Sequence, residues 1–443
     1  MPDVRRRLQA LRAFAAALAL LPGFAATPAG AQTLTPQERR IVAYVDAHTE
    51  EAVALLARLV DVNSGTMNAA GVREVGRMLA AELDSIGFET RWVSLPDSLR
   101  RAGHLFAEHR GSRGKRVLLI GHLDTVFEQD DPFQRFVRYG NTLSGPGVSD
   151  MKGGDVVIVY ALRALAAAGA LEGAQVIVAM TGDEEDPGLP LSISRADLVE
   201  AARRSDAALE FEGGSRDAGK EYAVTARRSS TGWTLRVGAR GGHSSGIFSD
   251  GTGSGAVFEA ARILSAFHEE LRGEQYLTFN PGVILGGTEV RFDPETGRGT
   301  AFGKTNVIAA TAVVAGDLRT LTDEQLQRAR EAMRHIVAQR GPQTTAAITF
   351  SEGYPSMPPT EGNRALLDRL NEVNRALGLA PMEAFDPGRR GAADISFVAP
   401  YVSGIGGLGV HGGGSHTERE TMDLASFATQ VKRAALLIYR LTR

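Results

Sequence analysis

Four carboxylates occupy four consecutive positions of the segment MTGDEEDPG, which spans 180–188. The segment follows AQVIVA, an apolar and partly β-branched run that is typical of a buried strand. Like charges gathered at a strand end repel one another, and a folded chain tolerates them where a cation or solvent compensates. Glu184 and Glu185, at the centre of the segment, therefore indicate a nearby cation.

Imidazole and carboxylate groups also follow other apparent strands. His122 and Asp124 follow RVLLIG, Asp150 precedes a helix in SGPGVSDMKGG, and Glu212 follows DAALEF. His416 lies in GGGSHTERE, after a glycine-rich stretch. The carboxyl ends of parallel strands meet at one edge of a sheet, so these distant residues are expected to share a small volume. A metal site is the simplest explanation.

Composition limits the chemistry of that site. The chain has no cysteine, which excludes thiolate ligands and leaves His, Asp and Glu. These ligands suit Zn²⁺ in a hydrolytic site that keeps one position open for water. Two ions about 3.5 to 4 Å apart need a bridging carboxylate, and together they activate water and polarise a carbonyl. A further carboxylate must then carry the proton from that water to the leaving nitrogen.

The first 31 residues have the pattern of a secretory signal peptide. Four arginines precede an apolar stretch at 13–21, and the segment ends in an A-x-A motif at 29–31. We therefore expect a protein exported to the periplasm or the medium. Removal of the leader changes the formal net charge from −3 to −6, and basic blocks are absent, which argues against nucleic acid or anionic membrane as a partner.

Alternating patterns predict an α/β fold. Helical periodicity covers 38–60, 71–87 and 153–168, while FETRWVSL, KRVLLIG and QVIVAMTG read as strands. This alternation predicts a mostly parallel sheet with helices on both faces. After residue 214 a β-α-β-β-α-β order, with helices at 254–271 and 323–339, indicates an inserted α+β domain. The predicted domains are 32–217 and 353–443 for the main unit and 218–352 for the insertion.

Six motifs in order resemble the M20 family of metallopeptidases, which includes glutamate carboxypeptidase and aminoacylases. They are HxD, GxxDMKGG, the DEE triplet, a later Glu, GGHSSG and GxxxHxxxE, and the resemblance runs from about Glu38 to the C-terminus. It implies a zinc-exopeptidase-like α/β fold with an inserted lid that serves in dimerisation. It also implies two Zn²⁺ per subunit, with Co²⁺ or Mn²⁺ as alternative ions.

The resemblance assigns a role to each residue of the metal site. Asp150 would bridge the two ions, His122 and Glu212 would complete one zinc, and Glu185 and His416 the other. This set implies a dinuclear hydrolase of the M20 type.

Two further residues support the chemistry in this family. Glu184 would act as general base and then acid, and Asp124 would hydrogen-bond the far nitrogen of His122, which fixes the ring's tautomer. The family also has a cis peptide bond after the bridging aspartate, here between Asp150 and Met151.

Three residues of the insertion match family positions that act across a dimer interface. His243 in ARGGHSSG would stabilise the oxyanion, a role commonly worth about 3 to 4 kcal/mol. Asn306 in KTNVIAA and Arg319 in GDLRT would hold the substrate. A homodimer paired through the insertion is therefore expected. Glutamate-releasing members carry a second arginine where this chain has Tyr354, so glutamate specificity does not follow from the resemblance.

Several residues have plain alternatives. Glu210 competes with Glu212 and His411 with His416, because each pair lies on one short segment. Asp150 alone would suit a helix N-cap. An isolated HxD is most often a capping pair, the DEED acids alone would suit a solvated loop, and His243 would suit a turn. Glu420 reads as a surface charge, and Arg389 and Arg390 as candidate replacements for the missing arginine.

The combined pattern predicts an exported dizinc metallohydrolase. It would cleave the amide bond of a peptide or N-acyl amino acid as a carboxypeptidase, by a metal-bridged water with Glu184 as base and acid. An aminopeptidase or aminoacylase is the nearer alternative, and a non-catalytic exported binding protein is the alternative from another class. The sequence specifies neither the leaving amino acid nor the metal used in the cell.

Overall fold

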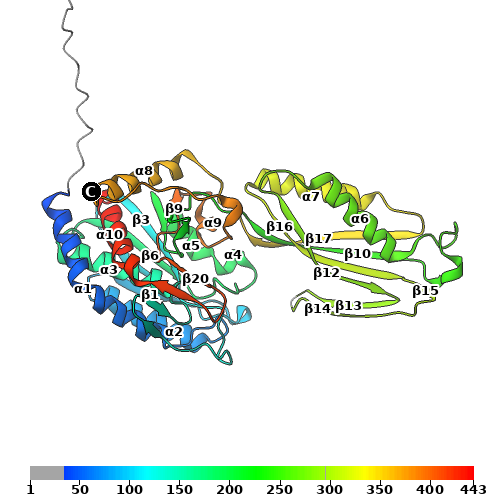
Figure 1. Cartoon of the computed structure of the whole chain (residues 1–443), viewed down its shortest axis with the longest axis horizontal. Helices are drawn as coiled ribbons and strands as arrows, with labels where there is room; N and C mark the ends of the chain where they lie inside the picture. Colours follow the sequence, from blue (N-terminus) through cyan, green and yellow to red (C-terminus); the bar gives the residue numbers. More distant parts are fainter. Residues whose placement is uncertain (1–33, 295) are drawn as a thin grey trace, which may run out of the picture.

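The computed structural model describes residues 34–294 and 296–443, so the predicted signal peptide lies outside the described residues. The chain forms two parts that lie end to end (Figure 1). We call residues 34–229 and 355–443 the main domain, and residues 230–354 the lid domain. Within the described residues, no helix has both the length and the apolar character needed to cross a bilayer.

The main domain contains a six-stranded sheet in the order β1-β2-β6-β3-β7-β19. Its strands are β1 (Glu89–Val93), β2 (His104–His109), β3 (Arg113–His122), β6 (Ala174–Thr181), β7 (Ala207–Glu210) and β19 (Gly404–Ile405). The four strands from β6 to β19 are parallel, whereas β1 and β2 add antiparallel pairs at one edge. The α/β prediction is confirmed, with a mixed sheet.

Alternate residues of the sheet pack into two cores. In β3, Val117 and Leu119 join one buried cluster while Leu118 and Ile120 join the other, which is the period-2 pattern of a strand buried on both faces. Helices cover both faces (Figure 1). The first cluster holds α1 (Pro36–Val60), α2 (Ala69–Asp84), α3 (Lys152–Ala167), α8 (Glu361–Ala376) and α10 (Leu424–Leu441), and the second holds α5 (Ala196–Arg203) and α9 (Ile395–Val398).

The lid domain is an antiparallel sheet in the order β12-β16-β10-β17. Its strands are β10 (Ser230–Ala239), β12 (Thr278–Gly287), β16 (Thr311–Arg319) and β17 (Thr344–Tyr354). Helices α6 (Gly255–Leu271) and α7 (Asp323–Ala338) cover one face, where Trp233 and Phe267 meet edge to face. A hairpin of β13 (Glu289–Asp293) and β14 (Arg298–Phe302), which the sequence patterns did not predict, lies beside β12 on the side away from those helices (Figure 1).

The lid sheet begins later than the predicted insertion. The strand β9 (Lys220–Ala223) falls inside the predicted range 218–352, yet it pairs with β8 (Ser215–Asp217) and with β18 (Glu383–Ala384) in the main domain. The remaining short elements are β4 (Val137–Tyr139), β5 (Thr142–Ser144), α4 (Leu191–Ser194), β11 (Gly242–His243), β15 (Val307–Ile308), β20 (Gly412–Gly413), β21 (Thr421–Asp423) and the 3₁₀ turns Asp97–Leu99, Ser244–Gly246 and Pro387–Arg389.

Candidate metal centre

The carboxyl ends of three neighbouring parallel strands bring the acidic segments together. His122 ends β3 and is the register partner of Thr181, the last residue of β6, two residues before the first of the DEED acids. Glu210 ends β7, two residues before Glu212, and β7 pairs with β3 on its other side. Parallel neighbours end at the same edge, so the strand register itself gathers these side chains.

Two groups of possible metal ligands share Asp150. One consists of His122, Asp150 and Glu212, and the other of Asp150, Glu185 and His416, with ligand atoms in each group within 4.8 Å of one another. His122 Nε2 lies 3.4 Å from Asp150 Oδ1 and 3.4 Å from Glu212 Oε1. His416 Nε2 lies 3.2 Å from Asp150 Oδ2 and 3.2 Å from Glu185 Oε2. The structure thus brings together all five residues predicted as ligands.

Backbone geometry supports the placement of these ligands. Asp150 lies one residue before Met151, the N-cap of α3, and the peptide bond from Asp150 to Met151 is cis, as the resemblance implied. His416 has a φ of 64°, in the left-handed region that a non-glycine residue adopts at a cost. This unusual conformation at a residue whose ring faces two carboxylates indicates a functional constraint on the loop.

The donor atoms fit a pair of divalent cations. His122 Nε2 and Glu185 Oε1 are buried and have no hydrogen-bond partner among the described residues. A buried polar atom without a partner is costly and calls for an explanation, such as an ion. Imidazole nitrogen and carboxylate oxygen are the ligands that zinc takes in hydrolytic sites. The residues present therefore fit two ions that share Asp150.

Burial and mutual contacts shift the pKa values of several groups in the cluster. Burial raises the pKa of Glu185 to about 7, and burial also raises the pKa of Glu184 well above its ordinary value. Hydrogen bonds that the His416 imidazole donates to the Asp150 and Glu185 carboxylates raise its pKa to about 11. Protons therefore occupy places that divalent ions would take, and metal binding is expected to release them.

Asp124 supports both the histidine ligand and the acidic segment. Its Oδ1 lies 3.5 Å from His122 Nδ1, which also lies 3.0 Å from the Asp124 carbonyl oxygen. The buried carboxylate accepts hydrogen bonds from Thr66 Oγ1 at 2.6 Å, from the Glu184 amide at 3.0 Å and from the Glu185 amide at 3.1 Å. The sequence suggested only the contact with the ring. The structure adds the hydrogen bonds from two backbone amides of the acidic segment to the Asp124 carboxylate.

Glu420 is a buried carboxylate, not the surface charge that its sequence context suggested. It accepts hydrogen bonds from the backbone amides of Gly147 at 3.3 Å, Ser149 at 2.8 Å and Asp150 at 3.0 Å. Burial raises its pKa to about 7. The GxxxHxxxE spacing was the available signal, because it places Glu420 on the loop of His416. The side chain joins that loop to the loop of Asp150.

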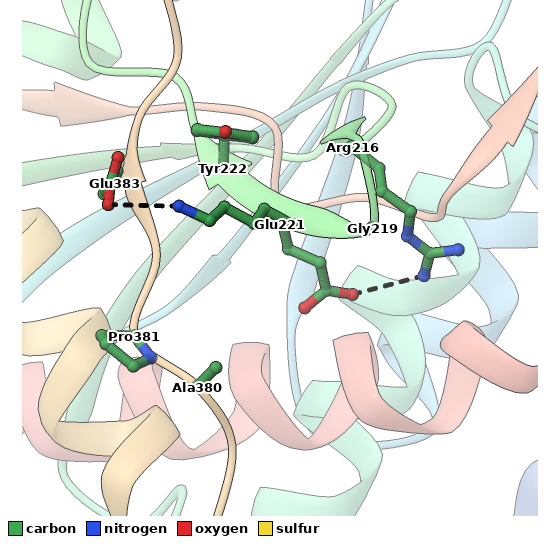
Figure 2. A pocket seen from close by; sticks show the side chains of 8 residues that line it. Arg216, Gly219, Glu221, Tyr222, Ala380, Pro381 and Glu383 are labelled. Atoms are coloured by element: carbon green, nitrogen blue, oxygen red, sulfur yellow. Dashed lines mark hydrogen bonds and ion pairs between the residues drawn. The ribbon is translucent and has the colours of Figure 1, made fainter.

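The structure separates both pairs of competing residues. Glu210 is buried with its Oε2 2.5 Å from Arg227 Nη2, so this carboxylate is occupied by an ion pair and belongs to neither ligand group. His411 turns toward Glu221, with 3.0 Å between Nε2 and Oε1. Figure 2 shows Glu221 in a surface pocket, where its carboxylate also faces Arg216 at 3.4 Å. The ligand groups contain Glu212 and His416 instead.

The two candidate arginines also have different surroundings. Arg389 pairs with the exposed Asp217 at 2.6 Å. Arg390 donates from Nη2 to the Gly213 carbonyl at 2.7 Å, and the same nitrogen lies 3.8 Å from Glu212 Oε2. Only Arg390 therefore lies beside the ligand groups.

The predicted lid residues do not join the metal ligands of their own chain. His243 is exposed, and its Nδ1 lies 2.8 Å from Ser245 Oγ. It pairs with Val307 in the β11–β15 ladder, next to Asn306, and β15 lies at the lid tip remote from the main domain (Figure 1). Arg319, at the opposite end of the lid sheet, pairs with Asp317 at 2.9 Å. The three residues thus belong to two distant ends of the lid.

Comparisons with known proteins identify the family. The model of peptidase family M20/M25/M40 matches residues 118–440. Carboxypeptidase G2 from Pseudomonas sp. (strain RS-16) is 26% identical over 426 residues, which covers 93% of this chain and 95% of that protein. Succinyl-diaminopimelate desuccinylase from Bordetella avium is 26% identical over 349 residues, which covers 75% and 85% of the two chains.

Solved structures share the fold at low identity. Aminopeptidase PepT from Bacillus cereus has a TM-score of 0.69 at 16% identity, covering 89% of this chain and 99% of that one. An M20 metallo-carboxypeptidase from Sulfolobus solfataricus has a TM-score of 0.64 at 14% identity, with 88% and 98% covered. A dinuclear metal-binding M20 peptidase from Bacillus subtilis has 0.62 at 15%, with 90% and 99% covered. Because the family match spans most of the sequence, the chain belongs to the M20/M25/M40 family of metallopeptidases.

Proposed function

We propose that the chain is an exported dizinc hydrolase that cleaves the amide bond of a peptide or N-acyl amino acid with a free carboxylate, as a carboxypeptidase. The observation that carries the proposal is the pair of ligand groups joined by Asp150, with Glu184 next to the ligand Glu185. Similarity to Carboxypeptidase G2 over nearly the whole of both chains supports it. Export rests on the signal-peptide pattern of residues 1–31.

The residues of the centre have two proposed roles: some bind metal, and one transfers protons. His122 and Glu212 would hold one ion, Glu185 and His416 the other, and Asp150 both. Bound zinc supplies Lewis-acid polarisation of the amide carbonyl and lowers the pKa of water.

Glu184 would take a proton from water and deliver it to the leaving nitrogen. Its amide hydrogen bond to Asp124 keeps this residue in register with the histidine ligand.

The lid residues fit a role in a dimer. His243 and Asn306 lie at the lid tip, so we infer that they serve the site of a partner subunit, where His243 would donate to the oxyanion. Exposed apolar side chains on the same domain support pairing through the lid. They are Phe248, Val257, Phe258, Ile284 and Phe302. Arg319 is proposed to hold the substrate carboxylate.

An aminoacylase or aminopeptidase activity is the second candidate. It is favoured by Tyr354, which stands where glutamate-releasing members have an arginine, and by the desuccinylases among the relatives. Hydrolysis of N-blocked and free-amine dipeptides separates the candidates. The carboxypeptidase is expected to release the C-terminal residue from N-blocked dipeptides. Turnover of free-amine dipeptides alone would move the assignment to an aminopeptidase.

The variant Glu184→Gln tests the chemistry directly. We expect elemental analysis to find two zinc ions per chain in both proteins, while kcat falls roughly 10²- to 10⁴-fold in the variant because the proton carrier is lost. The matched control is Asp186→Asn, which changes an exposed acid two residues along and leaves the ligand groups complete. Full turnover by metal-loaded Glu184→Gln would remove Glu184 from this role.

A further inference from the structure

A buried arginine lies behind the acidic segment. The Arg195 guanidinium is 1% exposed, and it donates from Nε to Asp394 Oδ1 at 2.7 Å and from Nη1 to Asp183 Oδ1 at 2.6 Å. Its Nη2 donates to the Asp183 carbonyl at 2.9 Å. A buried cation with two buried carboxylates is a fully paired group whose partners hold it in one orientation. Asp183, which had no assigned role in the sequence, is therefore an anchor for Arg195.

Tyr354 connects this buried arginine to the proposed base. The Tyr354 hydroxyl accepts a hydrogen bond from Arg195 Nη2 at 2.9 Å and donates one to the carbonyl oxygen of Glu184 at 2.7 Å. Its ring packs edge-on against Phe397, with 4.9 Å between centroids. The hydroxyl is thus used inside the protein, with both of its hydrogen-bonding functions occupied.

The chemistry of these two bonds explains why a tyrosine suits this position. The atom between Arg195 and the Glu184 carbonyl must accept from a guanidinium and donate to a carbonyl oxygen. A hydroxyl does both, whereas an arginine side chain has donors only and would place a second positive charge against Arg195. Tyr354, which stands where glutamate-releasing members have an arginine, therefore fits the hydrogen bonds with Arg195 and with the Glu184 carbonyl.

Tyr354 also marks the exit from the lid domain. It is the last residue of β17 and the register partner of Ser230, the first residue of β10. The chain thus enters and leaves the lid at this pair. One hydrogen bond from Tyr354 then links the hinge of the lid to the backbone of Glu184.

The peptide groups of Glu184 are held from both sides. Its N–H donates to Asp124 Oδ1 at 3.0 Å in the main domain, and its carbonyl oxygen accepts from Tyr354 at 2.7 Å. With the backbone held at both ends, the start of the Glu184 side chain has a defined position relative to the metal ligands. A misplacement of about 1 Å can cost a reaction about 100-fold, so such support matters.

We propose that Tyr354 is a positioning residue whose hydroxyl, oriented by Arg195, couples the end of lid strand β17 to the Glu184 backbone and so sets the position of the base. This inference rests on the proposed function only in taking Glu184 as the base. Tyr354 makes no contact with substrate in this role. The expected consequence is an effect on turnover and not on substrate affinity.

The variant Tyr354→Phe tests the proposal, because it removes one oxygen and keeps the ring packed against Phe397. Tyr401→Phe is the matched control: its hydroxyl also faces an arginine, with Arg203 Nη2 at 3.5 Å, but it is 47% exposed and outside the network. With an N-acyl amino acid as substrate, we expect Tyr354→Phe to lower kcat roughly 10- to 100-fold with KM nearly unchanged and both metals retained. Tyr401→Phe should behave as the wild type.

Amide hydrogen exchange gives a second readout that needs no activity. In the metal-loaded protein, exchange of residues 182–188 should be roughly 2- to 10-fold faster in Tyr354→Phe than in Tyr401→Phe, the range one lost hydrogen bond accounts for. Equal exchange in the two variants would overturn the link. A lower melting temperature with kcat unchanged would reduce Tyr354 to a structural role and overturn the proposal too.

The two readouts separate this inference from the proposed function. If the wild-type protein hydrolysed no amide, the carboxypeptidase proposal would fail, while the exchange comparison would still decide whether Tyr354 holds the Glu184 carbonyl. If the wild type were active and Glu184→Gln inactive, but Tyr354→Phe turned over normally, the function would stand and the positioning role would fall.

Discussion

The metal edge of the main domain and the tip of the lid domain gather their predicted residues in opposite ways. At the metal edge, residues from distant segments, from His122 to His416, lie within contact distance. In the lid, His243 lies in the small β11–β15 ladder at the tip, whereas Arg319 ends β16 at the opposite end of the domain. Parallel strands end at a common edge, whereas antiparallel strands distribute their residues along the sheet. The main domain therefore completes a cluster within one chain, and the lid does not.

The largest expected effect comes from the residue that the two ligand groups share. Asp150→Ala removes a ligand from both groups, so elemental analysis should find both ions lost or weakly held, and turnover should fall below detection. Asp186→Ala serves as the control, since its side chain is 64% exposed and it belongs to neither ligand group. If Asp150→Ala retained two ions, the view of a single-chain metal cluster at this edge would be wrong.

The lid tip is tested by complementation between chains. His243→Ala should keep both ions and lose roughly 10²- to 10³-fold in kcat, whereas His335→Ala, at an exposed lid histidine on α7, should not. A mixture of equal amounts of His243→Ala and Glu184→Gln should recover about a quarter of wild-type turnover. Random pairing puts half of the dimers in the mixed form, and each mixed dimer contains one complete site out of two. The absence of any recovery would mean that the lid acts within its own chain.

A smaller effect is expected beside the ligand groups. Arg390→Ala removes the donor to the Gly213 carbonyl next to Glu212, so metal affinity should fall about tenfold, as for other groups that orient ligands. Arg389→Ala, with its exposed partner Asp217, should leave metal affinity unchanged. Titration of the metal-free proteins with zinc measures both. Equal zinc affinity in Arg390→Ala and Arg389→Ala would contradict the inference that only Arg390 supports the ligand Glu212.

An effect of pH on the stability of the metal-free protein is also expected. Burial raises the pKa of Glu185 and of Glu420 from the ordinary 4.5 to about 7, so the folded protein binds more protons than the unfolded chain between those values. The contribution of these two groups to stability is thus fully present below about pH 4.5 and is lost as pH rises through about 7, by about 3 kcal/mol for each group. Melting temperatures of the metal-free protein should decrease over this range.

A matched pair of variants isolates the share of Glu420 in that decrease. Glu420→Gln should flatten the pH dependence, whereas Glu418→Gln, at an exposed acid of the same loop, should leave it as in the wild type. Zinc-loaded wild type should also show a weaker dependence, since a bound ion takes the place of the proton on Glu185. Parallel curves for the two variants would refute the buried character of Glu420.

Short-range patterns predicted much of the architecture. The helix expected at 153–168 is α3 at 152–167, and the one expected at 323–339 is α7 at 323–338, because apolar periodicity and capping residues are local properties. The hairpin of β13 and β14 was missed. In β13 only Val290 and Phe292 are half-buried, and every residue of β14 is exposed, so the alternation covers too few residues to mark a hairpin.

Local sequence patterns did not show which side chains contact one another in the folded protein. The motifs indicated Glu212 over Glu210 and His416 over His411 without a physical reason, and the structure supplies one, since Arg227 occupies Glu210 and Glu221 faces His411. Glu420 is a residue whose burial could not be predicted from its neighbours in the sequence. A carboxylate reads as a surface charge until three backbone amides from a loop some 270 residues away are seen to surround it.

The amino-acid sequence by itself determined which residue types are available for chemistry, a set of His, Asp and Glu without cysteine, and the local periodicity that makes α/β layers. Tertiary structure alone decided that the Tyr354 hydroxyl lies between Arg195 and the Glu184 carbonyl, and that His243 and Asn306 lie away from the metal ligands of their own chain. The physical reason is range. Periodicity is a property of neighbours along the chain, whereas a hydrogen bond or a ligand group depends on distances that only the folded register of distant segments sets.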